Sequence, residues 1–176
     1  MTANSSQLLL AGAVRRHALG WLVAANAVGV WLALILLWPE LGDALAPYSY
    51  GRWMPLHLDW QLYGWCALPL VGVILRHCLP ADGAGVAPAR GALGLWSAAL
   101  AVGGLEWLGG YSSGKLFLDW TGAPKAFFAF ALAALWLVLA REVWRGRAAG
   151  SIRGGALAAR LGLLALLAAV PGVLYW

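Results

Sequence analysis

Charged residues are scarce in this sequence. Only 11% of the 176 residues are Asp, Glu, Lys or Arg, whereas 62% are hydrophobic, and the mean hydropathy is +0.77. A soluble domain carries about 25% charged residues. The composition therefore excludes an ordinary soluble protein and predicts one that crosses a lipid bilayer several times. The net charge of +5 is interpreted as a signal of membrane topology, and no nucleic-acid partner is expected.

Cysteine is also rare, and the common catalytic motifs are missing. Cys66 and Cys78 are the two cysteines. They are separated by about 18 Å of rise on one predicted helix, which is beyond the reach of a disulfide. The sequence has no Cys-x-x-Cys-His haem-attachment motif, no closely spaced pair of histidines, no phosphate-binding loop and no nucleophile elbow. The chain by itself therefore shows no complete active site.

Apolar runs of membrane-spanning length are what the sequence has instead. A membrane helix needs about 20 mostly apolar residues, and five such runs predict a single all-α transmembrane domain over residues 1–176. The 12 tryptophans support this, since Trp favours the membrane–water boundary. The short polar start is expected to be retained, with no cleaved signal peptide. The predicted spans are residues 17–38, 57–75, 92–108, 126–140 and 156–175.

The basic residues predict an orientation. If the N-terminus is cytoplasmic, nine of the 12 Lys and Arg residues fall on the inside, and Arg52, Lys115 and Lys125 fall outside. This bias follows the positive-inside rule, so we expect a cytoplasmic N-terminus in a bacterial inner membrane. The nine inside residues are Arg15, Arg16, Arg76, Arg90, Arg141, Arg145, Arg147, Arg153 and Arg160.

His57 is the leading candidate for a functional residue. It stands at the start of the second apolar run, whereas the other two histidines, His17 and His77, are predicted at the opposite membrane face. An imidazole in this position is either an axial ligand of a haem iron or an interfacial histidine that reaches water. His77 is roughly 30 Å from His57 by helical rise. A second haem ligand would therefore have to come from another chain.

Arg52 and Asp119 are weaker candidates. An arginine just before a haem ligand could pair with a haem propionate, or it could be an ordinary loop charge. Asp119, with Ser112 or Ser113, could supply oxygen ligands to a divalent cation such as calcium, or it could be an ordinary loop acid.

The stretch that leads to His57 resembles a known family of membrane proteins. The run Tyr50-Gly51-Arg52-Trp53-Met54-Pro55-Leu56-His57 is similar to the start of the second helix in the catalytic subunit of C-family, cbb-type haem–copper cytochrome c oxidases. In that family a Gly-Arg-x-Arg-Pro-Leu-His stretch ends in an axial ligand of the low-spin haem b. Here the family's second arginine is Met54.

A second stretch agrees less closely. The segment from Gly110 to Asp119 is similar to the family's loop between helices three and four, although the family's first loop acid falls on Leu116. The resemblance covers nearly the whole chain and corresponds to the first five of about twelve family helices. The copper-binding histidines and the remaining haem ligands of the family lie beyond the fifth helix.

The resemblance implies the N-terminal portion of a split or truncated oxidase subunit. His57 would be one axial ligand of a low-spin haem b, and Arg52 a propionate partner. A partner chain would carry the remaining helices, the opposite haem ligand and the copper site, and c-type cytochrome subunits would deliver electrons. The electron acceptor would be oxygen, or less favourably nitric oxide. The same fold also suits a haem-free structural or assembly subunit of a respiratory complex, and an unrelated five-span protein with an interfacial histidine stays open.

Overall fold

The computed structural model describes residues 3–80, 82–115, 117 and 119–175, and every regular element in these segments is a helix. Seven are α-helices and one is a π-helix, which continues α3 into α4. The elements are α1 (Ala3–Leu37), α2 (Pro39–Ala44), α3 (Tyr50–Asp59), η1 (Trp60–Cys66), α4 (Ala67–Cys78), α5 (Val86–Leu108), α6 (Gly122–Ala148) and α7 (Gly154–Tyr175).

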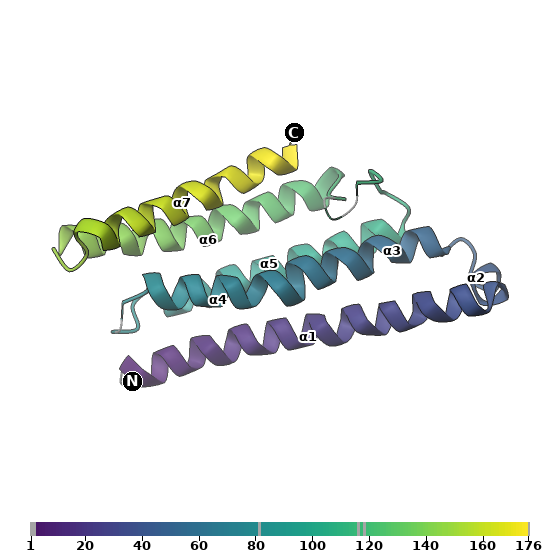
Figure 1. Ribbon diagram of the computed structural model, residues 1–176, viewed down its shortest axis with the longest axis horizontal. Helices are drawn as coiled ribbons and strands as arrows, with labels where there is room; N and C mark the ends of the chain where they lie inside the picture. Colours follow the sequence, from purple (N-terminus) through teal and green to yellow (C-terminus); the bar gives the residue numbers. More distant parts are fainter. Residues whose placement is uncertain (1–2, 81, 116, 118, 176) are drawn as a thin grey trace.

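Five helical segments among the described residues are long and apolar enough to cross a membrane, so the predicted all-α membrane bundle is confirmed. They are Ser5–Leu37, Tyr50–Cys78, Val86–Leu108, Gly122–Ala148 and Gly154–Val173. Successive spans run in opposite directions (Figure 1). The start of α1, the end of α4 and the connection between α6 and α7 lie at one end of the bundle, which we call the basic end. The end of α7, the connection between α2 and α3, and the end of α5 lie at the other.

The helices are longer than the spans predicted from the sequence. The starts of two of them change where candidate residues lie. Helix α1 begins at Ala3 rather than near His17, so His17 lies inside the helix. Helix α3 begins at Tyr50 rather than at His57, so Arg52 lies on a helix and not in a loop. Hydropathy marks the part of a helix that crosses hydrocarbon, and the more polar turns of α3 that precede His57 are invisible to that signal.

The fourth span differs in the same way. Helix α6 continues past the predicted end near Ala140 to Ala148. Glu142 therefore lies inside the helix, where it is buried and forms ion pairs with Arg141 and Arg145. Partners three residues apart on a helix lie on the same face, which explains how Arg145 reaches the buried carboxylate.

Local sequence explains where the helices end. Trp38 precedes Pro39 and Leu79 precedes Pro80, and a residue before proline is disfavoured in the α conformation. Helix α5 ends at Leu108, and two residues later Gly110 (φ +90°) donates its N–H to Trp107 O, while Tyr111 N–H donates to Glu106 O. This is a Schellman motif, in which the left-handed position favours glycine. Gly150 (φ +70°) ends α6 in the same way.

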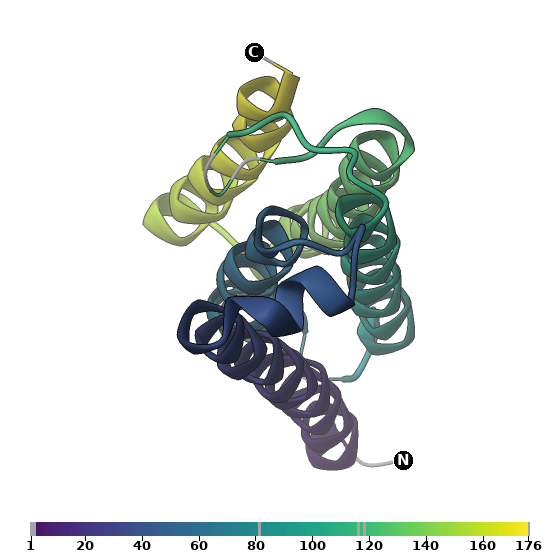
Figure 2. The same ribbon diagram turned by 90° about the vertical axis from the view of Figure 1, so that its right-hand side faces the viewer.

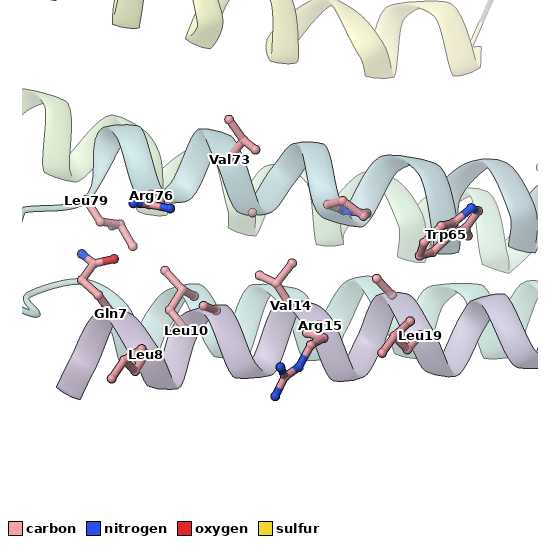
Figure 3. Close-up of a pocket in the computed structure, with 14 residues that line it drawn as sticks. Gln7, Leu8, Leu10, Val14, Arg15, Leu19, Trp65, Val73, Arg76 and Leu79 are labelled. Atoms are coloured by element: carbon pink, nitrogen blue, oxygen red, sulfur yellow. The ribbon is translucent and has the colours of Figure 1, made fainter. Parts of the chain in front are cut away.

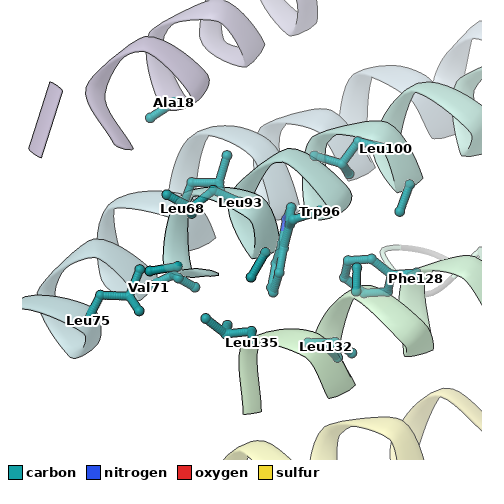
Figure 4. Close-up of a cluster of buried hydrophobic side chains, with 14 of the residues drawn as sticks. Ala18, Leu68, Val71, Leu75, Leu93, Trp96, Leu100, Phe128, Leu132 and Leu135 are labelled. Carbon is teal, nitrogen blue, oxygen red and sulfur yellow. The ribbon is translucent and has the colours of Figure 1, made fainter. Parts of the chain in front are cut away.

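The core lies between α4, α5 and α6. Trp96 of α5 and Phe128 of α6 meet edge to face there, with ring centroids 5.0 Å apart, and leucines of α4 pack around them (Figure 4). Viewed end-on, α1 and α7 occupy opposite sides of the bundle (Figure 2). Helix α7 packs against α6, and α1 packs against α3, η1 and α4. The pair of helices α1 and α3 carries the candidate site.

Candidate functional site

The imidazole of His57 is held against the backbone of α1. Its Nδ1 lies 2.8 Å from the carbonyl oxygen of Ala25. The ring also lies directly over Gly29, one helical turn further along α1. A Cβ atom on Gly29 would stand 2.6 Å from Cε1 of His57, which is closer than van der Waals contact allows. Two small residues on one face of α1 therefore form a cradle for the ring.

This contact decides which nitrogen of His57 carries the proton. A carbonyl oxygen can only accept a hydrogen bond, so Nδ1 must donate to Ala25. A neutral imidazole with its proton on Nδ1 has its lone pair on Nε2. Histidines that bind metals characteristically donate their other ring N–H to a carbonyl or carboxylate, which fixes the tautomer and the ring orientation. In this tautomer the lone pair of His57 is on Nε2, the nitrogen that would bind a metal.

Neither of the other histidines can share one haem with His57. His17 lies inside α1, eight residues before Ala25, which corresponds to about 12 Å of rise. Helix α1 begins before the predicted start of the first span, so His17 lies within the helix and not at its first residue. His17 Nδ1 lies 2.6 Å from Ser97 Oγ, which also accepts a hydrogen bond from Trp21 Nε1. His77 is exposed near the basic end.

Arg52 lies one and a half turns before His57 and points to the end of α5. Its Nη1 donates to the carbonyl oxygen of Leu108 at 3.0 Å, and the guanidinium lies over Gly110. The last carbonyls of a helix lack partners within the helix and carry partial negative charge, so the cation of Arg52 stabilises the C-terminus of α5. The same contact places the guanidinium on the His57 end of the bundle.

Asp119 and the two serines come together as predicted from the sequence. The carboxylate of Asp119 is buried and accepts hydrogen bonds from Ser112 Oγ at 2.5 Å, from Ser113 Oγ at 2.7 Å and from the Ser113 backbone N–H. These bonds close the connection between α5 and α6. A cation here stays a prediction: the hydroxyls donate to the carboxylate, and the described residues contain no group of three His, Cys, Asp or Glu side chains that could hold a metal ion. Leu116 lies outside the described residues.

Asp59 is a buried acid that the sequence analysis did not single out. Its side chain is fully buried, and neither carboxyl oxygen has a hydrogen-bond partner among the described residues. Only Leu58 separates it from His57, so the two side chains leave the helix on different faces. Asp59 is the last residue before the π-helix η1, and such segments occur frequently at functional sites. An acid inside an apolar span is the signal that could have identified it.

Polar contacts between neighbouring helices fix the positions of the helices around His57. Gln61 Nε2 of η1 donates to Asn26 Oδ1 of α1 at 3.0 Å, a polar contact that joins the two helices. Trp60 Nε1 donates to the carbonyl oxygen of Leu100 at 3.0 Å, and its ring lies against Gly104. Since Asn26 adjoins Ala25, the Gln61 contact helps to hold α1 in register with His57.

Comparisons with known proteins provide no relative from which a role for this site could be transferred. No family model matches the chain, and neither a curated protein nor a solved structure matches it. The five apolar helices among the described residues identify the chain as an integral membrane protein. The functional argument for His57 accordingly rests on residue chemistry and geometry.

Proposed function

We propose that this chain supplies one axial ligand, His57, to a low-spin haem b in a cbb-type terminal oxidase. The oxygen-reducing haem–copper centre would lie on a partner chain, and c-type cytochrome subunits would provide electrons. The observation that carries the proposal is the 2.8 Å contact between His57 Nδ1 and the carbonyl oxygen of Ala25. It leaves Nε2 with a lone pair, as a haem ligand requires.

The residues present suit an imidazole ligand. Ala25 fixes the tautomer of His57, and Gly29 leaves room for the ring beside α1. A carbonyl that accepts a hydrogen bond from Nδ1–H also raises the basicity of Nε2, which strengthens a bond to iron. Haem, when bound, would supply one-electron redox chemistry at this end of the bundle. The role of the chain is to bind and orient it.

Arg52 would serve the same site in a secondary way. Its guanidinium has five N–H donors in a planar fork, and within the part of the chain that the structure describes only Nη1 is engaged, at the carbonyl oxygen of Leu108. It can therefore accept a carboxylate in a bidentate pair while it holds the end of α5. The second axial ligand must come from outside this chain, because neither His17 nor His77 lies close enough to His57.

The test uses the respiratory complex purified through a tag on this chain. His57→Ala should remove the low-spin haem b bands from the reduced-minus-oxidised absorption spectrum while the chain still inserts into the membrane. The matched control is His77→Ala, which removes an exposed imidazole and should leave the spectrum unchanged. Loss of the bands in both variants, or in neither, would reject His57 as the ligand.

A second function is favoured by one observation. Arg52 already has a structural role at the carbonyl of Leu108, as expected of a haem-free structural or assembly subunit of a respiratory complex. In that case the purified complex contains this chain, and His57→Ala changes the stability of the complex but not its haem content. Haem quantified per complex therefore separates the two functions.

A further inference from the structure

A groove of about 900 Å³ runs along the surface of the bundle between α1 and the η1–α4 segment. Gln7 and Leu79 line one end, near the basic end of the bundle, and Leu19 and Trp65 line the other (Figure 3). Gln7 Nε2 lies 3.4 Å from the carbonyl oxygen of Pro80, a contact that joins the two walls. The groove is on the other half of the bundle from His57.

The length and lining of the groove suit an acyl chain. From Gln7 to Leu19 the wall formed by α1 covers about 18 Å of rise, and one leaflet of a bilayer contributes about half of the 30 Å hydrocarbon core. Val14 lines the groove beside Gly72, whose added Cβ would stand 2.7 Å from Val14 Cγ1. Glycine lets the helices approach closely at this level. The groove therefore has one leaflet's depth and an apolar floor.

Two arginines give the groove a charge. Arg15 of α1 and Arg76 of α4 both line it. Figure 3 shows Arg76 beside Leu79, and Arg15 projecting from the outer side of α1. Neither arginine forms an ion pair with an acidic side chain among the described residues. The ion pairs found there join Glu142 to Arg141 and Arg145. An apolar groove that carries two unpaired arginines complements a lipid with a negatively charged headgroup.

We propose that this groove binds one anionic phospholipid from the leaflet at the basic end. One acyl chain lies along the floor between α1 and α4, and the phosphate lies near Arg76, while Arg15 adds positive charge on the outer side of α1. Basic pockets between membrane helices bind anionic lipid headgroups in this manner. The proposal depends on the membrane fold and the groove, and it is independent of haem binding at His57.

The test is native mass spectrometry of the full chain released from nanodiscs that contain phosphatidylglycerol or phosphatidylcholine. Phosphatidylglycerol should be retained about tenfold more than phosphatidylcholine, the size of effect that one or two arginines near a headgroup provide. The double variant Arg15→Gln/Arg76→Gln should lose this preference. The matched control, Arg147→Gln/Arg153→Gln, removes two exposed arginines from the same end of the bundle, outside the groove, and should keep the preference.

A second variant tests the apolar floor without changing charge. Ala11 lines the groove and is exposed, so Ala11→Phe should fill space that the acyl chain needs and reduce retention of both lipids. Equal retention of the two lipids by the wild type would overturn the proposal. If both arginine double variants lost the preference for phosphatidylglycerol equally, the proposal would also be overturned, because the preference would then depend on the overall charge of the chain. A dimer that disappears in Ala11→Phe would assign the groove to a second copy of the chain instead.

Discussion

Gly29 and His57 are in direct contact: the imidazole ring lies so close to the glycine that an added Cβ would stand 2.6 Å from Cε1 and 2.9 Å from Nδ1. The two residues are far apart in the sequence and belong to α1 and α3. Because the ring also donates to Ala25 one turn earlier, its position on α1 is set by two small residues. The geometry of the proposed haem ligand therefore depends on a neighbouring helix.

Gly29→Ala should displace the imidazole of His57. The new methyl group would overlap the ring, so the 2.8 Å bond to Ala25 lengthens and the direction of Nε2 changes. In the purified complex we expect a shifted or weakened low-spin haem b spectrum. The matched control is Gly20→Ala on the same helix, where an added Cβ meets no atom within 4 Å. Identical spectra for Gly29→Ala and the wild type would argue against the cradle.

Asp59→Ala should leave the stability of the bundle unchanged or raise it. The substitution removes a buried carboxyl group whose oxygens have no hydrogen-bond partner among the described residues, and a buried polar group left unpaired costs about 1–3 kcal/mol. The comparison is Leu56→Ala, three residues earlier and equally buried, which should lose about 2–5 kcal/mol. Denaturation in detergent followed by circular dichroism measures both. A loss at Asp59 as large as that at Leu56 would mean that the carboxyl group has a stabilising partner, such as an ion or water.

Asp119→Ala should loosen the connection between α5 and α6. Three donors from Ser112 and Ser113 lose their acceptor, which costs on the order of 1–3 kcal/mol. Lys115 is exposed in this connection, so trypsin should cleave after it about ten times faster in reconstituted vesicles. Asp43→Ala, an exposed acid at the same end, should not alter the rate. An unchanged cleavage rate in Asp119→Ala would show that the three bonds do not order the connection.

The orientation of the bundle can be tested by labelling single cysteines. In a Cys66→Ala/Cys78→Ala background, Ser49→Cys should react with an impermeant maleimide in intact cells, because the basic end is expected to be cytoplasmic. Ser151→Cys, in the connection at the basic end, should react only after the membrane is permeabilised. The reverse pattern would place the N-terminus outside.

The fold could be predicted from hydropathy because each span has enough consecutive apolar residues to cross the hydrocarbon core of a bilayer. The helix edges could not, since polar residues such as those around Tyr50 and Arg145 continue a helix without any apolar signal. The presence of His57 on the second span was also predictable, although the structure places it inside the helix rather than at its start. Its contacts with Ala25 and Gly29 were not, because they depend on how α1 and α3 pack. Asp59 could have been identified, since an acid among apolar residues is visible in the sequence.

The most direct test of the central claim is a cryo-electron microscopy map of the assembled complex that contains this chain. The account predicts a porphyrin beside α3, with its iron bonded to Nε2 of His57 and its opposite face bound by a residue of a partner chain. A map in which that imidazole faces lipid or water, with no porphyrin next to it, would contradict the account.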